Sequence, residues 1–139
     1  MNTFKNDTSL EKRVELNRRI RENYPDRVPI IVSVPASEKI HLTKDKFLVS
    51  KDSSIATFLT ELRKQSDIDS SKALFIFCGK NNVLVPTNHT LGQIYEKYVD
   101  EDGFLYITMT LENTFGTVID AILDSILHYS GRISRTLLT

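Results

Sequence analysis

Two segments that are apolar on both faces constrain the fold of this chain more than any other feature of its sequence. RVPIIVSV predicts a strand over residues 28–34, and ALFIFC predicts another over residues 73–78. Runs of this kind, without regular polar alternation, are typical of strands buried on both sides of a sheet. Helices have to cover such a sheet, so the sequence predicts an α+β domain with a mixed sheet.

A charged amphipathic helix is predicted ahead of the first strand, from about residue 9 to residue 23. Thr8 is its expected N-cap, and Glu11 three residues later completes a capping box. Apolar residues recur on roughly one helical face, at Leu10, Val14, Ile20 and Tyr24. The charges of this helix have two interpretations: a solvated face on which they pair, or a contact surface for tubulin, an acidic partner or anionic lipid.

The next segments predict a strand and a helix. KFLVS is the second strand, at Lys46–Ser50, and Ser53 or Ser54 caps the helix that follows it. Apolar residues of this helix fall at i, i+4 and i+7, which are Ile55, Leu59 and Leu62.

The last third of the chain predicts a hairpin, a short helix and a final strand. GKNN turns ALFIFC into VLVPT, Thr90 caps the helix LGQIYEKYV, and Asp102-Gly103 is a turn before the strand FLYITMT over residues 104–110. After the first helix the order is therefore β-β-α-β-β-α-β, which predicts the β-grasp layout of ubiquitin-like proteins.

Composition and charge exclude several classes of protein. The 139 residues are enough for one domain, and 18 Lys and Arg balance 18 Asp and Glu, so nothing indicates a nucleic-acid partner. One cysteine excludes an internal disulfide framework and indicates a reducing compartment. The first residues lack the apolar region of a secretory signal, and no apolar run approaches the roughly 18 residues of a membrane span. We expect a cytoplasmic protein.

No catalytic, metal or cofactor site is predicted. The histidines, at positions 41, 89 and 128, have no metal-ligand spacing, and a single cysteine gives no zinc cluster. Gly79-Lys80 lies in a hairpin turn and lacks the preceding glycine of a phosphate loop. Cys78 is interpreted as a small buried residue at a strand end rather than a nucleophile. We expect a protein that is not an enzyme.

Several blocks in order resemble the autophagy-related protein 8 family, ubiquitin-like modifiers that include GABARAP and microtubule-associated protein light chain 3. NYPDRVPIIV is the first of them. The others are LEKR, KFLVSKDSSIATFL, NNVLVPTNHTLGQIYEKYVDEDGFLYITM and the pair Phe115-Gly116. The resemblance covers about residues 4 to 116. It implies an N-terminal helical subdomain at 1–25, a ubiquitin-like core at 26–116, and a C-terminal extension at 117–139 that is removed by processing.

In such proteins a cysteine protease of the autophagy system exposes a C-terminal glycine. An activating and a conjugating enzyme then transfer that glycine to the amine of phosphatidylethanolamine on the autophagosome membrane. The resemblance places this conjugation at Gly116, preceded by Phe115. A residue without a side chain can enter a narrow protease slot and approach a catalytic cysteine closely. A flexible hinge before a helix is the plainer interpretation of the same glycine.

The resemblance also implies a groove that binds cargo receptors through a short motif, an aromatic residue followed three positions later by an aliphatic one. The motif adds as a strand beside the second strand, and its two side chains enter two apolar pockets. The aromatic pocket would comprise Ile20, Pro29, Ile31, Lys46, Leu48 and Phe104. The second pocket would comprise Phe47, Val49 and Phe58.

The second pocket departs from the family pattern. Ser50, Ser53 and Glu61 stand where the family has a proline and two aliphatic residues. Losing two aliphatic walls removes on the order of 1–3 kcal/mol of apolar burial, so we expect weaker or differently selective binding.

The segment after Gly116 predicts a further helix, with Thr117 as its cap and Gly131 at its end. Its apolar residues lie along one side: Val118, Ile119, Ile122, Leu123, Ile126 and Leu127.

Two other functions stay open. One is an interaction module or cytoskeletal adaptor that is not lipidated and keeps its tail, and the other is a modifier attached to protein lysines.

Overall fold

The computed structural model describes residues 4–111 and 122–123. In this part of the chain the elements are α1 Phe4–Asp7, α2 Leu10–Asn23, β1 Arg27–Ser33, β2 Lys46–Ser50, α3 Ile55–Lys64, β3 Leu74–Cys78, β4 Val83–Leu84, α4 Leu91–Tyr98 and β5 Leu105–Leu111. After the N-terminal helices, this order confirms the predicted β-β-α-β-β-α-β sequence. The short helix α1 was not predicted.

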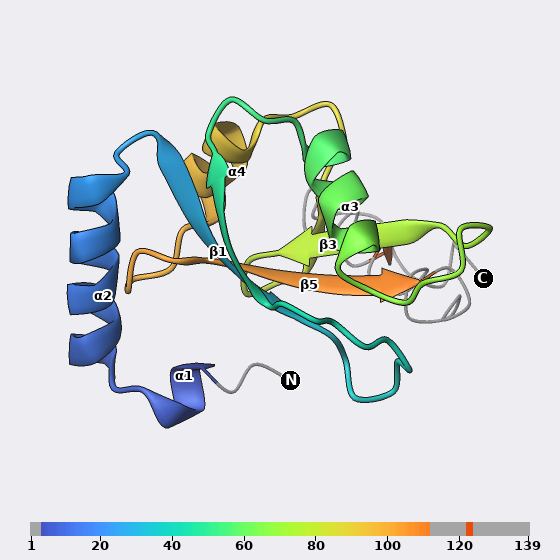
Figure 1. Ribbon diagram of the computed structural model, residues 1–139, viewed down its shortest axis with the longest axis horizontal. Helices are drawn as coiled ribbons and strands as arrows, with labels where there is room; N and C mark the ends of the chain where they lie inside the picture. Colours follow the sequence, from blue (N-terminus) through green and yellow to red (C-terminus); the bar gives the residue numbers. More distant parts are fainter. Residues whose placement is uncertain (1–3, 112–121, 124–139) are drawn as a thin grey trace.

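One mixed sheet carries the fold, with strand order β2-β1-β5-β3-β4. The central strands β1 and β5 run parallel, and every other pair is antiparallel. The last described strand in sequence order, β5, therefore lies in the middle of the sheet, and β2 lies at an edge (Figure 1). The prediction of a mixed sheet from the two-sided apolar segments is confirmed.

The main core lies between the sheet and helices α3 and α4. Phe58 and Leu62 from α3, with Leu91 and Ile94 from α4, are at most 2% exposed and pack with the inward side chains of the strands. The predicted caps hold: the Ser54 side chain accepts a hydrogen bond from the Thr57 N–H, and Thr90 forms a complete capping box with Gln93.

The helix α2 stands apart from α3 at one end of the sheet, at the left of Figure 1. Its N-cap is Ser9, whose side chain accepts a hydrogen bond from the Lys12 N–H, so the prediction of Thr8 as N-cap was wrong. The Thr8 N–H instead bonds to the Phe4 carbonyl and closes α1. The unpredicted helix displaces the cap by one residue.

The apolar face predicted for α2 does not pack on the core. Leu10 and Val14 are 42% and 44% exposed, whereas Arg13 is the helix's buried residue. The Arg13 Nε atom lies 3.2 Å from Asp102 Oδ2 beneath the helix. A polar contact between distant segments therefore decides which side of α2 faces the sheet.

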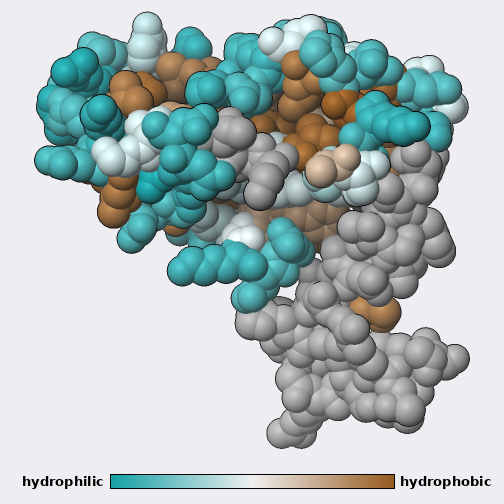
Figure 2. All heavy atoms as spheres, turned by 90° about the horizontal axis from the view of Figure 1, so that it is seen from below, coloured by the Kyte–Doolittle hydropathy of each residue, from teal (hydrophilic) through white to brown (hydrophobic). Residues whose placement is uncertain are grey.

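Apolar side chains also remain at the surface. Figure 2 shows them in patches set among hydrophilic residues on the face of the molecule seen from below. Within the described residues, no helix combines the length and the hydropathy needed to cross a bilayer. The pair Phe115-Gly116, which is predicted for lipid conjugation, and most of the predicted helix after it lie outside the described residues; Ile122 and Leu123 are helical.

The turn before β5 requires glycine. Gly103 has φ +92°, a region that L-residues rarely adopt, and a Cβ atom there would lie 1.9 Å from Asn17 Nδ2 of α2. The predicted Asp102-Gly103 turn is thus confirmed, and the side chain of Asn17 on α2 packs directly against Gly103.

Replacing Gly103→Ala should lower the free energy of unfolding by at least about 1–3 kcal/mol, the typical cost of a strained backbone alone. Urea unfolding followed by circular dichroism measures the loss. The same change in an Asn17→Ala background should be less damaging, because the clash is gone and only the backbone strain is left. Equal stability of Gly103→Ala and the unmodified protein would contradict the requirement for glycine at this turn.

Candidate functional site: an apolar groove beside the edge strand

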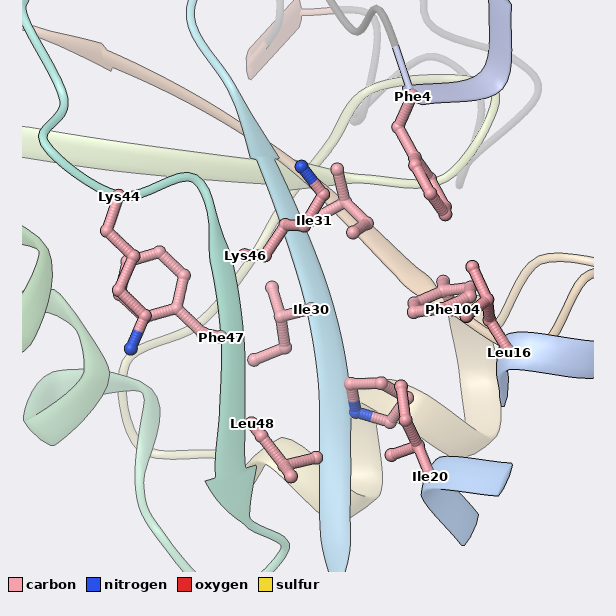
Figure 3. A pocket seen from close by; sticks show the side chains of 11 residues that line it. Phe4, Leu16, Ile20, Ile30, Ile31, Lys44, Lys46, Phe47, Leu48 and Phe104 are labelled. Atoms are coloured by element: carbon pink, nitrogen blue, oxygen red, sulfur yellow. The ribbon is translucent and has the colours of Figure 1, made fainter. Parts of the chain in front are cut away.

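A cavity of about 360 Å³ lies between α2 and the β1–β2 hairpin, and α1 closes one side of it (Figure 3). Its lining is almost entirely apolar and consists of Phe4, Leu16, Ile20, Pro29, Ile30, Ile31, Lys44, Lys46, Phe47, Leu48 and Phe104. All the residues predicted for the aromatic pocket are in this lining. We call the cavity the first pocket.

Strand register explains how the first pocket is built. Pro29 of β1 pairs with Leu48 of β2, and Ile31 pairs with Lys46. Directly opposed residues of antiparallel strands place their side chains on the same face, about 5 Å apart. Ile30, between Pro29 and Ile31, turns to the other face and joins the main core. One face of the hairpin thus forms most of the pocket's sheet side and the other packs into the core, although Ile30 and Phe47 of the core face also border the pocket.

The remaining walls come from segments far away in the sequence. Ile20 reaches the pocket from α2, and Phe104 reaches it from the position directly before β5. Phe104 is fixed by its own N–H, which donates to Asp102 Oδ1 at 2.9 Å. The carboxylate that pairs with Arg13 therefore also holds a wall of the pocket.

Lysines give the groove its positive charge. The Lys46 ammonium lies 3.4 Å from Asp45 Oδ1, but both side chains are more than half exposed, so water and salt screen the pair and it contributes little. The Lys44 ammonium lies 4.9 Å from the centroid of the Phe47 ring. Both lysine side chains are exposed and border the apolar lining of the first pocket.

A second cavity, of about 310 Å³, lies between β2 and α3. Its lining is Lys44, Phe47, Leu48, Val49, Thr57, Phe58, Thr60, Glu61 and Lys64. The residues predicted for the second pocket, Phe47, Val49 and Phe58, are brought together here. Phe47 and Phe58 are 5% and 1% exposed and meet edge to face with their centroids 5.4 Å apart, so they form its floor.

The rim of this second pocket is polar. Thr57, Thr60, Glu61 and Lys64 surround the apolar floor. Ser50 is not in the lining, and its carbonyl instead accepts a hydrogen bond from the Ser53 N–H in the turn after β2. The second pocket therefore offers less apolar surface at its mouth than the first.

Comparison with known proteins decides the family. A family model described as "Autophagy protein Atg8 ubiquitin like" matches residues 12–116. The autophagy-related protein 8 of Dictyostelium discoideum is 45% identical over 119 residues, covering 84% of this chain and 96% of that protein. The Schizosaccharomyces pombe protein of the same name is 46% identical over 116 residues, covering 83% and 94%.

The chain belongs to the Atg8 family. The crystal structure of Trypanosoma brucei ATG8 has the same fold, with a TM-score of 0.74 and 34% identity over 81% of this chain and 96% of that one. The protein is therefore an Atg8-family autophagy modifier with the predicted α+β ubiquitin-like fold, and members of this family are not enzymes.

Sequence reasoning missed part of the first pocket of this Atg8-family chain. Phe4, Leu16, Ile30 and Lys44 also line it, together with Phe47, which was predicted for the second pocket. Phe4 is an isolated apolar residue in a polar stretch, so no periodic pattern marks it. Leu16 lies four residues before Ile20 on α2, and this spacing would have placed the two side chains on one helical face.

The charged face of α2 is largely paired within the helix. Arg18 bonds to both Glu15 and Glu22, and Arg19 Nε lies 3.3 Å from Glu15. The hydrogen bond and charge of Arg18, with a smaller contribution from Arg19, lower the pKa of Glu15 to about 2. This arrangement is the solvated, paired face, one of the two interpretations of the sequence.

The described residues contain no cluster of three or more His, Cys, Asp or Glu side chains that could hold a metal ion. Cys78 is buried at the end of β3, and burial raises the pKa of its thiol to about 12. Because the thiolate is the reactive form, this cysteine is poorly suited to act as a nucleophile.

Cys78 should consequently resist alkylation in the folded protein. At pH 8 a maleimide should label the native protein at least about a hundredfold more slowly than the urea-unfolded protein, because both the thiolate fraction and access are reduced. Mass spectrometry over time measures both rates, with glutathione as the control thiol. Labelling of the native protein at the glutathione rate would contradict the burial of Cys78.

Proposed function

We propose that this protein is processed after Gly116 and joined through that glycine to phosphatidylethanolamine on autophagosome membranes. Family membership supports the proposal, and so does the extent of the family match, which ends at residue 116. A cysteine protease would free the glycine carboxyl group, and activating and conjugating enzymes would transfer it to the lipid amine as an amide. The protein would thus be cytoplasmic before conjugation and membrane-bound afterwards.

The groove supplies the second half of the proposed function, the capture of cargo receptors. β2 lies at the edge of the sheet, and an edge strand offers its backbone N–H and C=O groups to an added strand. The first pocket lies beside β2 and is apolar, with Lys46 at its mouth. This single arrangement carries the proposal: an extended peptide pairs with β2, its aromatic side chain enters the first pocket, and acidic residues of the peptide meet the lysines.

The second pocket would receive the aliphatic residue of the motif. Its floor of Phe47 and Phe58 is apolar, but Glu61 and the threonines of α3 surround it. We therefore propose that the aromatic residue contributes most of the affinity and that the aliphatic position is less selective.

Lipid conjugation is tested with Gly116→Ala. This variant should fold normally but should show neither processing nor membrane attachment, because the protease and the conjugating enzymes require a residue without a side chain. Mass spectrometry of protein recovered from starved cells measures the new C-terminus and the lipid. Gly131→Ala is the matched control and should behave like the unmodified protein.

Two outcomes would overturn the conjugation proposal. Membrane-bound Gly116→Ala protein would show that the residue is wrongly assigned. An intact C-terminus at Thr139 without any lipid-linked form would indicate an interaction module or cytoskeletal adaptor that keeps its tail. Attachment to protein lysines in a reconstituted reaction would instead favour a protein-conjugated modifier.

Peptide capture is tested with Lys46→Ala combined with Leu48→Ala. The affinity for a synthetic peptide with tryptophan and, three positions later, leucine should fall at least about tenfold. Truncating Leu48 alone removes about 2 kcal/mol of apolar contact, and about 1.4 kcal/mol already corresponds to a factor of ten. Isothermal titration calorimetry measures the change. Lys97→Ala, on α4 and outside the groove, is the control, and equal affinities for both variants would refute the groove assignment.

A further inference from the structure

Phe4, on the short helix α1, forms a wall of the first pocket. The sequence did not indicate this wall. Building on the proposed capture of aromatic motifs, we propose that Phe4 is a specificity-determining residue, which makes this pocket select a tryptophan side chain over a smaller aromatic one.

The Phe4 ring faces the pocket together with Phe104. Their centroids are 5.2 Å apart and their planes are inclined by 76°, an edge-to-face contact. Figure 3 shows the Phe4 side chain extending from α1 toward Phe104 and Leu16, across the pocket from β2. The Lys46 ammonium lies 5.6 Å from the Phe4 centroid. Phe4 therefore lies between Phe104 on one side of the pocket and Lys46 of β2 on the other.

Polar contacts hold α1 in this position. The helix is only Phe4–Asp7 and none of its residues is buried, so no apolar core of its own fixes it. The Lys5 ammonium bonds to Asp100 Oδ1 at 2.6 Å and lies 4.5 Å from the centroid of the Tyr106 ring. Burial works against the charged form of Asp100, but the bonds from Lys5 and from the Asp102 N–H outweigh it and keep the pKa of Asp100 below its usual value.

The ion pair of Lys5 and the ring contact of Phe4 involve the same segment of the chain. Asp100 and Tyr106 flank Phe104 in the sequence, on the turn after α4 and on β5. Lys5 pairs with Asp100 of this segment, and the neighbouring Phe4 packs against the ring of Phe104. Holding Lys5 thus holds the Phe4 ring against Phe104.

Phe4 forms a wall of the pocket and does not fill it. The cavity retains about 360 Å³ with Phe4 in its lining, within the range of sites that bind small ligands. An entering ring therefore meets Pro29 and Leu48 on the sheet side and the rings of Phe4 and Phe104 on the other. Aromatic pairs with centroids about 4.5–7 Å apart attract each other beyond simple burial.

The size of the indole explains the selectivity. A phenyl ring seated against the strands has little area left to reach α1, whereas an indole extends further and gains a contact with the Phe4 ring. Such aromatic contacts are worth roughly a three- to tenfold change in affinity. Without Phe4, the far side of the indole would face water.

The test compares two synthetic peptides that differ only in having tryptophan or phenylalanine at the aromatic position. Calorimetry with the full chain should show tighter binding of the tryptophan peptide. In Phe4→Ala the affinity for that peptide should fall about three- to tenfold, while the phenylalanine peptide should lose less than about twofold. Lys5→Met, which releases the anchor but keeps the ring, should reduce the preference for tryptophan by a smaller factor.

Leu10→Ala is the matched control, since Leu10 is a 42% exposed apolar residue outside the pocket lining. It should leave both affinities unchanged, and thermal unfolding should show that every variant is folded. A constant tryptophan-to-phenylalanine ratio in Phe4→Ala would overturn the proposal. Tighter binding by Phe4→Ala would also overturn it, because Phe4 would then be a competitor for the pocket. If neither peptide bound the unmodified protein, the proposed capture of motifs would itself fall; loss of selectivity alone would leave that function standing.

Discussion

The carboxylate of Asp102 is the point on which the rest of the structure depends. Asp102 is 1% exposed, and its oxygens meet Arg13 of α2 and accept hydrogen bonds from the Phe104 N–H and the Tyr106 hydroxyl. A buried charge that loses one partner typically destabilises a protein by about 3–5 kcal/mol. The helix α2 therefore has to dock where Arg13 can reach, although it brings few apolar side chains to the interface.

The contact between Arg13 and Asp102 stabilises the docking of α2 and also positions walls of the groove. α2 contributes Ile20 to the first pocket, and the turn held by Asp102 contributes Phe104, so both walls are positioned by one carboxylate. The opposite wall belongs to the β1–β2 hairpin, which is held by the main core on its other face. The groove thus forms where the ubiquitin-like core meets a helix that an ion pair attaches to the turn before β5.

The sequence was informative where patterns are local. Strands that are apolar on both faces predicted the mixed sheet, and short polar caps such as Ser54 and Thr90 predicted where helices begin. The sequence was uninformative where contacts between distant residues determine which side of an element is buried. The apolar spacing of α2 indicated a face with Leu10 and Val14, yet the buried partner of Arg13 lies far along the chain and turns that face outward. The short helix α1 and its contacts leave no local signature in the sequence.

The place of β5 in the sheet has a consequence for how the chain is made. β5 is the last strand of the sheet in sequence order, yet it lies between β1 and β3. During synthesis the β1–β2 hairpin and the β3–β4 hairpin emerge as two separate half-sheets, each with an inner edge that has no strand beside it until β5 arrives. Unpaired edges invite association with other chains, and long-range pairing is slow to form. A chain that ends before residue 105 would therefore expose the inner edges of both half-sheets, because the strand that pairs with both is missing.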